Sequence, residues 1–248
     1  LPIYDARQAY KLTPEQLHDA LNERTRLVYL VDPNNPLGIA YTRGEIEAFT
    51  DICREAGVYL IHDCTYRHFA HSHTLAARFY PERTITTYSF SKWLGLAGLR
   101  VGAIVAAPEL IEQLASAPPN NLGSNVLSQR AALAGLAVKS RWFPEVQRVQ
   151  RDNQAEILAA VSAIPGLEMP VYPSNGNFLA VDCQESGCSA NNIADELLTS
   201  GFFIRTSDYH SETLKDLFLK ISTTVPEEWV GSFCSEFPKV FEKCASRG

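Results

Sequence analysis

The chain has 248 residues, a formal net charge of −6 and a hydrophobic content of 46%. This length allows one large domain or two smaller ones, and the composition is that of an ordinary folded protein. The negative charge argues against nucleic acid and membrane surfaces as partners, and no apolar run is long enough to cross a bilayer. The first ten residues lack the basic start and apolar segment of a signal peptide.

In the first part of the chain, strand-like and helix-like segments alternate. Thr13 and Thr42 each begin a capping box, which predicts helices over residues 14–21 and 43–57. Short apolar segments rich in β-branched and aromatic residues predict strands at 26–32, 58–63, 84–91 and 101–106. Strands of this kind, separated by helices, indicate an α/β fold: a mostly parallel sheet in a three-layer αβα arrangement, covered on both faces.

The second part of the chain has a different pattern. It predicts two helices, then three strands interleaved with two further helices, in the order of a smaller α+β domain. The predicted helices cover 124–139, 142–163, 189–200 and 227–244, and the predicted strands cover 178–183, 202–207 and 217–223. We expect a large domain over residues 1–140 and a C-terminal small domain over 141–248.

Cysteine and histidine spacing gives no sign of a metal site. The six cysteines form no Cys-x-x-Cys pair, and no cysteine–histidine set has zinc-ligand spacing. We therefore expect reduced thiols in a cytoplasmic protein, and no metal. Four histidines lie close together in the sequence but match no ligand motif, so surface positions are predicted for His62, His68, His71 and His73.

Polar residues follow the predicted strands, where the ligand sites of parallel sheets lie. They are Asn35 after the first strand, Asp63 and Tyr66 after the second, Ser89 and Lys92 after the third, and Arg100 eight residues beyond the lysine. The four motifs they form, in chain order, are NPLG, D-x-x-Y, S-x-x-K and K-x7-R. This series resembles the pyridoxal-phosphate (PLP) enzymes of fold type I, in particular the class I/II aminotransferases.

The resemblance implies a PLP-binding large domain, a homodimer, and transfer of an amino group between an amino acid and a 2-oxo acid. Asp63 matches the carboxylate that keeps the pyridine nitrogen protonated, because an opposite charge favours the charged form. Tyr66 and Asn35 match hydrogen-bond partners of the cofactor's phenolic oxygen. Lys92 matches the lysine that forms the Schiff base and, once freed, shuttles a proton. Lys92, Asp63 and Tyr66 are thus the expected catalytic residues.

The cofactor's phosphate group needs its own ligands. Arg100 matches a two-pronged ionic contact and Ser89 a hydroxyl contact, and Ser91 is a further cofactor-binding candidate. Only 34 residues precede Asn35, whereas the family has a longer segment there, with part of the phosphate site. We therefore expect this chain alone to bind PLP poorly and to have little activity. Residues 118–128 resemble a segment that lies near the partner subunit's site.

The predicted substrate-binding residues include a departure from the family pattern. The family carries an arginine that grips the substrate α-carboxylate in a strand of the form x-R-I-S, and here FLKIST places Lys220 at that position. Lysine keeps the charge but loses the bidentate fork. Arg205 in FFIRTS and Asn177 in SNGNFL are the other substrate-binding candidates.

Other interpretations stay open because a fold does not fix a reaction. A different PLP reaction on the same fold is one alternative: decarboxylation, β-elimination as in a lyase, or oxidative deamination. Another is the aminotransferase-like sensor domain of a transcription regulator, and a further one is an inactive relative. An inactive relative would be expected to lose its site residues over time. The presence of Asn35, Asp63, Tyr66, Lys92 and Arg100 argues against a long period of such loss.

Overall fold

A computed structural model describes residues 1–117 and 123–246, so part of the segment 118–128 lies outside the described residues. The chain forms two compact units. The first comprises Leu1–Asn35 and Ile39–Trp142, and the second comprises Pro36–Gly38 and the residues from Phe143 onward.

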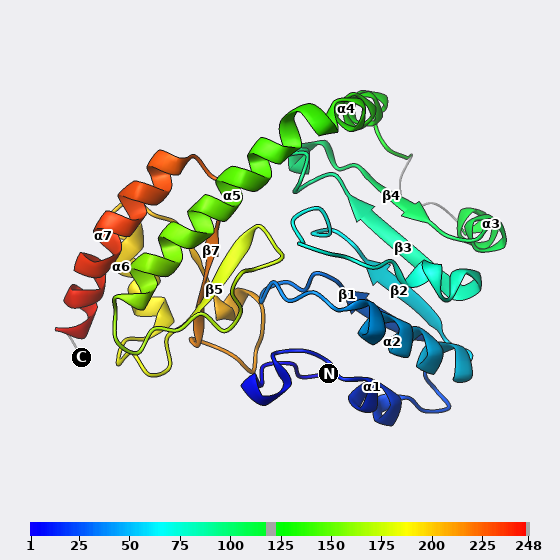
Figure 1. Cartoon of the computed structure of the whole chain (residues 1–248), viewed down its shortest axis with the longest axis horizontal. Coiled ribbons are helices and arrows are strands. Elements are labelled where there is room, and N and C mark those ends of the chain that lie inside the picture. Colours follow the sequence, from blue (N-terminus) through cyan, green and yellow to red (C-terminus); the bar gives the residue numbers. More distant parts are fainter. Residues whose placement is uncertain (118–122, 247–248) are drawn as a thin grey trace. The chain divides into compact units, whose positions relative to one another are not determined.

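The first unit is built on a four-stranded sheet in the order β1-β2-β3-β4 (Figure 1). Its strands are β1 (Leu27–Val31), β2 (Tyr59–Asp63), β3 (Thr84–Ser89) and β4 (Gly102–Val105). The first three strands are parallel, and β4 is antiparallel to β3. The prediction of a mostly parallel sheet is therefore confirmed.

Two helices of this unit begin where the sequence predicts them. In α1 (Pro14–Ala20) the Thr13 hydroxyl accepts from the Gln16 backbone, and in α2 (Arg43–Glu55) Thr42 and Glu45 form the same capping box. Helix α2 contacts β2. The buried residues of α2 include Ile46 and Phe49, and the alternate residues Leu60 and His62 of β2 are also buried. Buried residues recur about every 3.6 positions on the helix and every second position on the strand, so each element has one apolar face, and these faces explain why the two elements pack together.

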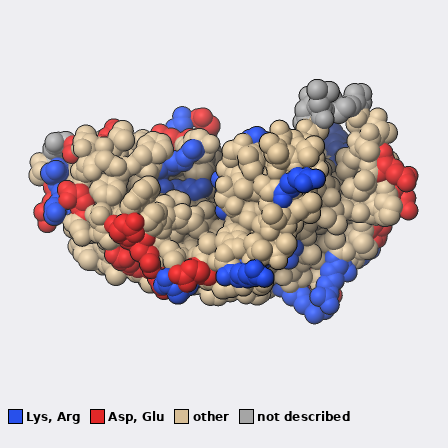
Figure 2. Space-filling view, turned by 90° about the horizontal axis from the view of Figure 1, so that it is seen from above, with Lys and Arg blue, Asp and Glu red and all other residues tan. Residues whose placement is uncertain are grey.

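The outer strands are less covered than those of a fully buried parallel sheet. Tyr29 on β1 is 58% exposed, and all four residues of β4 are exposed. On the face drawn in Figure 2, acidic and basic side chains occur in small scattered groups, with no continuous basic surface among the described residues.

Helices α3 (Pro108–Ser116), α4 (Val126–Ala137) and α5 (Lys139–Ser162) follow the sheet, and α5 passes from the first unit into the second. No helix in the described ranges is long and apolar enough to cross a membrane. Short 3₁₀ helices cover Ala6–Gln8, Ala76–Arg78, Pro81–Arg83, Ala97–Leu99 and Ser207–Tyr209.

The second unit is an antiparallel three-stranded sheet with helices on one face. The strands β5 (Phe178–Asp182), β6 (Arg205–Thr206) and β7 (Phe218–Ser222) have the order β5-β7-β6. Helices α6 (Ala190–Thr199) and α7 (Glu227–Ala245) share a core with α5 and with alternate strand residues. The α+β pattern expected from the sequence is thus present.

The predicted strand at 202–207 is mostly a loop. Only Arg205 and Thr206 pair with β7, whereas Phe202 and Ile204 pack against the core from outside the sheet. The apolar start of FFIRTS therefore reflects core packing rather than strand pairing.

Neighbouring leucines of α6 allow a test of this core. Leu197 is fully buried and Leu198 is 54% exposed. We expect Leu197→Ala to lower the free energy of unfolding by about 2–5 kcal/mol, because it leaves a cavity. Leu198→Ala, the matched control, is expected to change it by no more than about 0.5 kcal/mol. Urea unfolding followed by circular dichroism measures both, and equal losses would contradict the assigned packing.

Candidate active site

The parallel register brings three of the predicted site segments to one edge of the first unit's sheet. Val31 lies opposite Asp63 and Asp63 lies opposite Thr87, so β1, β2 and β3 end side by side. Asp63 and Ser89 are the last residues of β2 and β3, and the loops that follow the three strands carry Asn35, Tyr66 and Lys92. The strand-end interpretation of the sequence is therefore consistent with the topology.

The carboxylate of Asp63 has hydrogen-bond donors on both oxygens. Oδ1 accepts from the Thr65 backbone at 3.0 Å and from the Thr65 hydroxyl at 2.7 Å, and Oδ2 accepts from the Tyr29 hydroxyl at 2.5 Å. Burial, followed by the hydrogen bond to Asp63, raises the pKa of Tyr29 to about 12. The Tyr29 phenol therefore stays protonated at neutral pH and donates to the carboxylate.

Sequence reasoning missed both partners of Asp63. Thr65 lies within the D-x-x-Y motif, two residues after Asp63, where the backbone N–H commonly donates to an aspartate side chain and closes a local turn. Tyr29 was detectable only from strand pairing, because its period-two position places it on the same face of the sheet as Asp63.

The phenol of Tyr66 lies close enough to Asp63 to be affected by its charge. Its side chain is buried, and burial, followed by the charge of Asp63, raises its pKa to about 12. The hydroxyl is consequently a proton-bearing group at neutral pH, suited to donate a hydrogen bond to an oxyanion.

The loop that carries Lys92 is anchored by its neighbours. Trp93 is buried, and its ring stacks on Trp142 at 6.0 Å and contacts His68 at 4.5 Å between centroids. A Cβ on Gly135 of α4 would lie only 2.4 Å from the Leu94 side chain, so the absence of a side chain there lets Leu94 pack closely. Lys92 itself is exposed beside this anchored segment.

One of the residues that anchor the Lys92 loop, His68, is a neutral histidine. Lys139 donates from Nζ to Nδ1 of His68 at 2.7 Å. Burial, and then the charge of Lys139, lower the pKa of His68 to about 4, so the ring can accept this bond at neutral pH. His68 is only partly exposed, which the surface prediction did not anticipate.

The predicted phosphate ligands lie in the same turn region, where the two serines contact each other and Arg100 bonds elsewhere. Ser89 Oγ accepts from the Ser91 backbone at 3.1 Å. Arg100, which has a left-handed backbone with φ of 49°, is exposed and donates from Nη1 to the Ala97 carbonyl at 2.8 Å. Within the described residues, no hydrogen bond joins Arg100 to Ser89.

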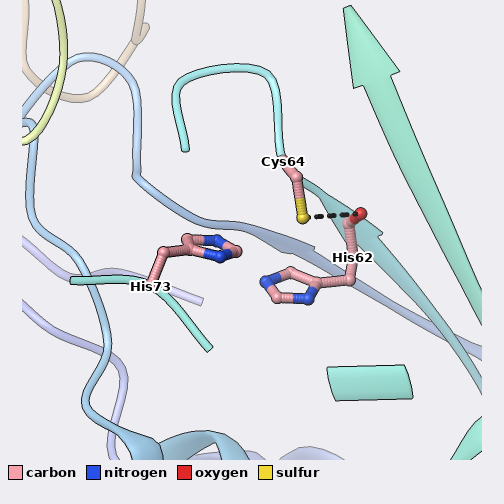
Figure 3. A group of neighbouring side chains, drawn as sticks. All are labelled: His62, Cys64 and His73. Atoms are coloured by element: carbon pink, nitrogen blue, oxygen red, sulfur yellow. Dashed lines mark hydrogen bonds between the residues drawn. The ribbon is translucent and has the colours of Figure 1, made fainter. Parts of the chain in front are cut away.

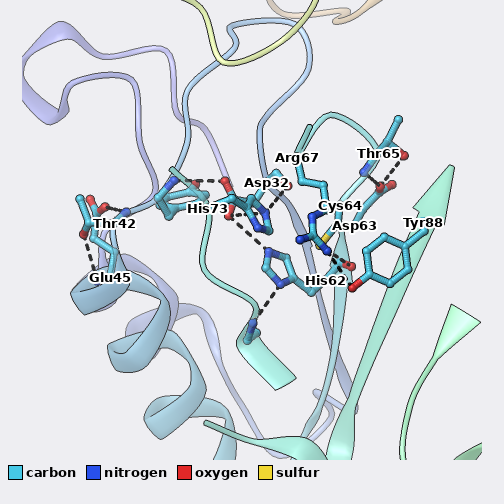
Figure 4. A network of polar contacts seen from close by, with 12 residues as sticks. Asp32, Thr42, Glu45, His62, Asp63, Cys64, Thr65, Arg67, His73 and Tyr88 are labelled. Carbon is cyan, nitrogen blue, oxygen red and sulfur yellow. Dashed lines mark hydrogen bonds and ion pairs between the residues drawn. The ribbon is translucent and has the colours of Figure 1, made fainter. Parts of the chain in front are cut away.

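A second aspartate, absent from the sequence prediction, is buried beneath the loop that leads to Asn35. Asp32 has no exposed surface, and its carboxylate accepts from the Tyr41 backbone at 3.1 Å (Figure 4). Oδ2 lies 3.3 Å from Nε2 of His62 and 3.2 Å from Nε2 of His73. Burial raises the pKa of Asp32, but the hydrogen bonds from the two histidines outweigh it and hold the pKa below its usual value.

The predicted surface positions of His62 and His73 are therefore wrong. Both side chains are buried, and their rings stack at 5.3 Å between centroids. His62 takes an inward position of β2, two residues after the buried Leu60, and the polar ring is tolerated there because Asp32 provides a partner. His71 is exposed, as predicted.

Cys64 lies beside these two histidines (Figure 3). Potential ligand atoms of His62, Cys64 and His73 lie within 4.8 Å of one another. Both nitrogens of His62 already have partners, because Nε2 faces Asp32 and Nδ1 accepts from the Ala76 backbone at 3.2 Å. Burial holds the pKa of the Cys64 thiol well above its usual value, which disfavours the thiolate that a metal would need. We interpret the group as a hydrogen-bonded buried network.

The predicted substrate-binding residues belong to the second unit. Arg205 of β6 and Lys220 of β7 are direct cross-strand neighbours, so their side chains leave the same face of the sheet. Asn177, just before β5, donates from Nδ2 to the Thr224 hydroxyl at 2.8 Å.

Comparison with known proteins gives a consistent family. The model of "Aminotransferase class I and II" matches residues 2–237. A histidinol-phosphate aminotransferase of Methanopyrus kandleri is 32% identical over 229 residues, which cover 92% of this chain and 56% of that protein. An aspartate aminotransferase of Pyrococcus horikoshii is 25% identical over 192 residues, 75% of this chain and 49% of that protein. The chain thus spans about half the length of these relatives.

Solved structures share the fold. A PLP-dependent aminotransferase from Streptococcus suis 89-1591 superposes with a TM-score of 0.86 at 16% identity, covering 97% of this chain and 63% of that chain. A variant of Thermus thermophilus aspartate aminotransferase gives a TM-score of 0.83 at 23% identity, covering 94% of this chain and 65% of that chain.

The buried aspartate gives a pH-dependent prediction. A carboxyl whose pKa is lowered by folding stabilises the fold above its ordinary pKa, and this contribution is lost as the pH falls through the lower, folded-state value. We expect Asp32→Asn to lower the free energy of unfolding at pH 7 by about 1–3 kcal/mol. The difference from wild type should shrink as the pH falls below about 4.

Chemical denaturation at pH 7, 5 and 3 measures this difference. The matched control is Asp19→Asn on α1, because Asp19 also lies beside a histidine, His18, but is exposed. It should change stability by less than about 0.5 kcal/mol at each pH. A stable Asp32→Asn variant, or a loss that is the same at pH 3 as at pH 7, would disprove the role assigned to the buried charge.

Proposed function

The chain belongs to the class I and II aminotransferase family, and on that premise we propose that its protein moves an amino group between an amino acid and a 2-oxo acid with PLP as cofactor. The observation that carries this proposal is the strand-end carboxylate of Asp63, held by Thr65 and Tyr29 and adjacent to the Tyr66 phenol. The two relatives compared above are both described as aminotransferases, which favours transamination over the other PLP reactions.

The chemistry of the residues fits the cofactor. An Asp63 carboxylate complements a protonated ring nitrogen, a protonated Tyr66 complements the phenolic oxyanion, and an exposed lysine amine can bond to an aldehyde. The residues that would hold PLP are Asn35, Asp63, Tyr66, Ser89, Ser91, Lys92 and Arg100. Arg100 serves, with Ser89 and Ser91, as a phosphate ligand once its guanidinium no longer donates to the Ala97 carbonyl.

When bound, PLP supplies an electron sink for the substrate Cα. Lys92 would hold the cofactor and, when its amine is free, Nζ would accept the proton from the substrate Cα and pass it to the cofactor's C4′ carbon. Asp63 keeps a negative charge at the ring nitrogen, and Thr65 and Tyr29 fix the orientation of that carboxylate. Tyr66 and Asn35 donate to the phenolic oxygen.

We extend the proposal to the two domains and the assembly. Residues 1–140 form the PLP-binding domain, and residues 141–248 form the small domain that contacts the substrate through Lys220, Arg205 and Asn177. The protein acts as a homodimer in the cytoplasm. All six cysteines lie in the described ranges without a disulfide, which supports a reducing compartment.

Trapping of the lysine tests the proposal directly. We expect borohydride reduction of the full-length protein with PLP to leave a covalent cofactor adduct on Lys92, found by peptide mass spectrometry. Lys92→Arg, which keeps the charge, should leave no adduct. Lys92→Ala should lower the transamination rate by about 10²–10⁴-fold, because it removes the positioned base. An adduct on a different lysine would refute the assignment.

The role of Asp63 gives a prediction on binding. Asp63→Asn keeps an acceptor for Thr65 but loses the charge, so we expect PLP affinity to fall by at least about tenfold. Absorbance titration with PLP measures this. Asp51→Asn, which removes an exposed carboxylate paired with Arg54 on α2, serves as the control and should bind as wild type does. Unchanged affinity in Asp63→Asn would count against the pyridinium contact.

A further inference from the structure

One short segment from the first part of the chain belongs to the second unit. Pro36–Gly38 directly follow Asn35, and they group with the C-terminal part of the chain rather than with the first unit. Their turn is closed at its base, where the Asn34 backbone donates to the Ile39 carbonyl at 2.8 Å. Asn35, a predicted ligand of the cofactor, is thus the residue at which the chain leaves the first unit.

The tip of this turn is anchored by a loop of the second unit, residues 174–177. The Gly38 carbonyl accepts from the Asn175 backbone at 2.7 Å. Gly38 has a left-handed φ of 77°, and a Cβ added there would lie 1.9 Å from Ser174 Oγ, so this close approach depends on glycine. Asn35 therefore lies between an anchor at the base of the turn and an anchor at its tip.

The 174–177 loop is itself held by a buried amide of α5. Gln154 Oε1 accepts from the Ser174 backbone N–H at 3.1 Å, and Gln154 Nε2 donates to the Ser174 carbonyl at 3.2 Å. Both residues are buried, and Ser174 lies outside any helix or strand. One side chain thus satisfies both backbone groups of Ser174, and its loss would leave them buried without these partners.

The preceding residue of α5 is a second buried amide with different partners. Asn153 donates from Nδ2 to the carbonyls of Thr223 and Val225 at 3.0 and 2.9 Å. Asn153 is as buried as Gln154, but it supports the segment that follows β7. Within the described residues, its side chain makes no hydrogen bond to the 174–177 loop. The two amides therefore differ in the loop that each one holds.

We propose that Gln154 is a positioning residue for the cofactor contact of Asn35. Gln154 fixes Ser174 and so holds the loop whose backbone anchors the turn after Asn35. The turn in turn sets the direction in which the Asn35 amide donates to the phenolic oxygen of PLP. This inference rests on the proposed function, and it adds a residue whose effect is indirect, through Ser174 and Gly38.

A displaced Asn35 has a spectroscopic consequence. An amide that donates to the phenolic oxygen stabilises its negative charge, so the proton shared with the neighbouring Schiff-base nitrogen is lost at a lower pH. If the amide is misdirected, the Schiff base keeps this proton to a higher pH. The visible absorbance of bound PLP reports this titration without any substrate.

The test is a pH titration of the visible absorbance of the full-length protein loaded with PLP. We expect Gln154→Met, which keeps the side-chain length and removes both hydrogen bonds, to raise the midpoint by about one pH unit. Asn35→Ala should raise the midpoint by a similar amount. In the Asn35→Ala background, Gln154→Met should cause no further rise, because both changes act through the same contact.

Asn153→Leu is the matched control that separates positioning from packing. It removes an equally buried amide of α5, so it should lower the urea midpoint of the apoprotein as Gln154→Met does. The absorbance midpoint should stay at the wild-type value, because the Ser174 contact is intact. A rise in Asn153→Leu equal to that in Gln154→Met would show that any loss of a buried amide suffices, and would overturn the inference.

A second variant tests the link at the turn and is decisive if Gln154→Met does not fold. In Gly38→Ala the added Cβ collides with Ser174 Oγ, so the turn must move and the absorbance midpoint should rise. Adding Ser174→Gly removes the colliding atoms and should bring the midpoint back toward the wild-type value. A wild-type midpoint in Gly38→Ala would contradict the inference.

Failure of the inference can be told apart from failure of the proposed function. A wild-type midpoint in Gln154→Met, or an additive rise in the double variant with Asn35→Ala, overturns the role of Gln154 and leaves transamination standing. If the unaltered protein shows neither a Schiff-base absorbance nor the Lys92 adduct, the proposed function falls, and the role of Gln154 falls with it.

Discussion

The shared register of three parallel strands is the constraint on which the first unit depends. Because Val31, Asp63 and Thr87 are paired across β1, β2 and β3, the loops after these strands must leave the sheet at one edge. Polar side chains from segments far apart in the sequence are thereby gathered without any of them specifying the fold. A slip of one residue would turn Asp63 toward α2 and His62 toward the opposite face.

Two aspartates near this edge have different roles because their surroundings differ. Asp32 is fully enclosed and meets two histidines and a backbone amide, so its charge is used to fix the loop before Asn35. Asp63 is only partly buried and is oriented by a threonine and a tyrosine. The first stabilises the loop, and the second is positioned to receive a cationic partner.

Local signals made most of the fold predictable. Capping boxes at Thr13 and Thr42 located both early helices, and β-branched apolar runs located the strands. The motif series led to the family. Contacts across strands were not predictable, because the histidine cluster at 62–73 has no local mark that distinguishes burial from exposure. The buried partner of His62 lies 30 residues earlier in the chain. The loop at 202–204 was misjudged because apolar residues that pack on a core outside a sheet look like those of a strand.

The hydrogen bond between Tyr29 and Asp63 joins a chromophore to the carboxylate at the centre of the site. Ionisation of a phenol changes its ultraviolet absorbance, and the pKa of this phenol is raised first by burial and then by its hydrogen bond to Asp63 and the charge of that carboxylate. A cationic group that pairs with the Asp63 carboxylate compensates its negative charge and makes the Tyr29 phenol easier to ionise. The ionisation of Tyr29 is therefore coupled to whether the Asp63 carboxylate is paired with a cation.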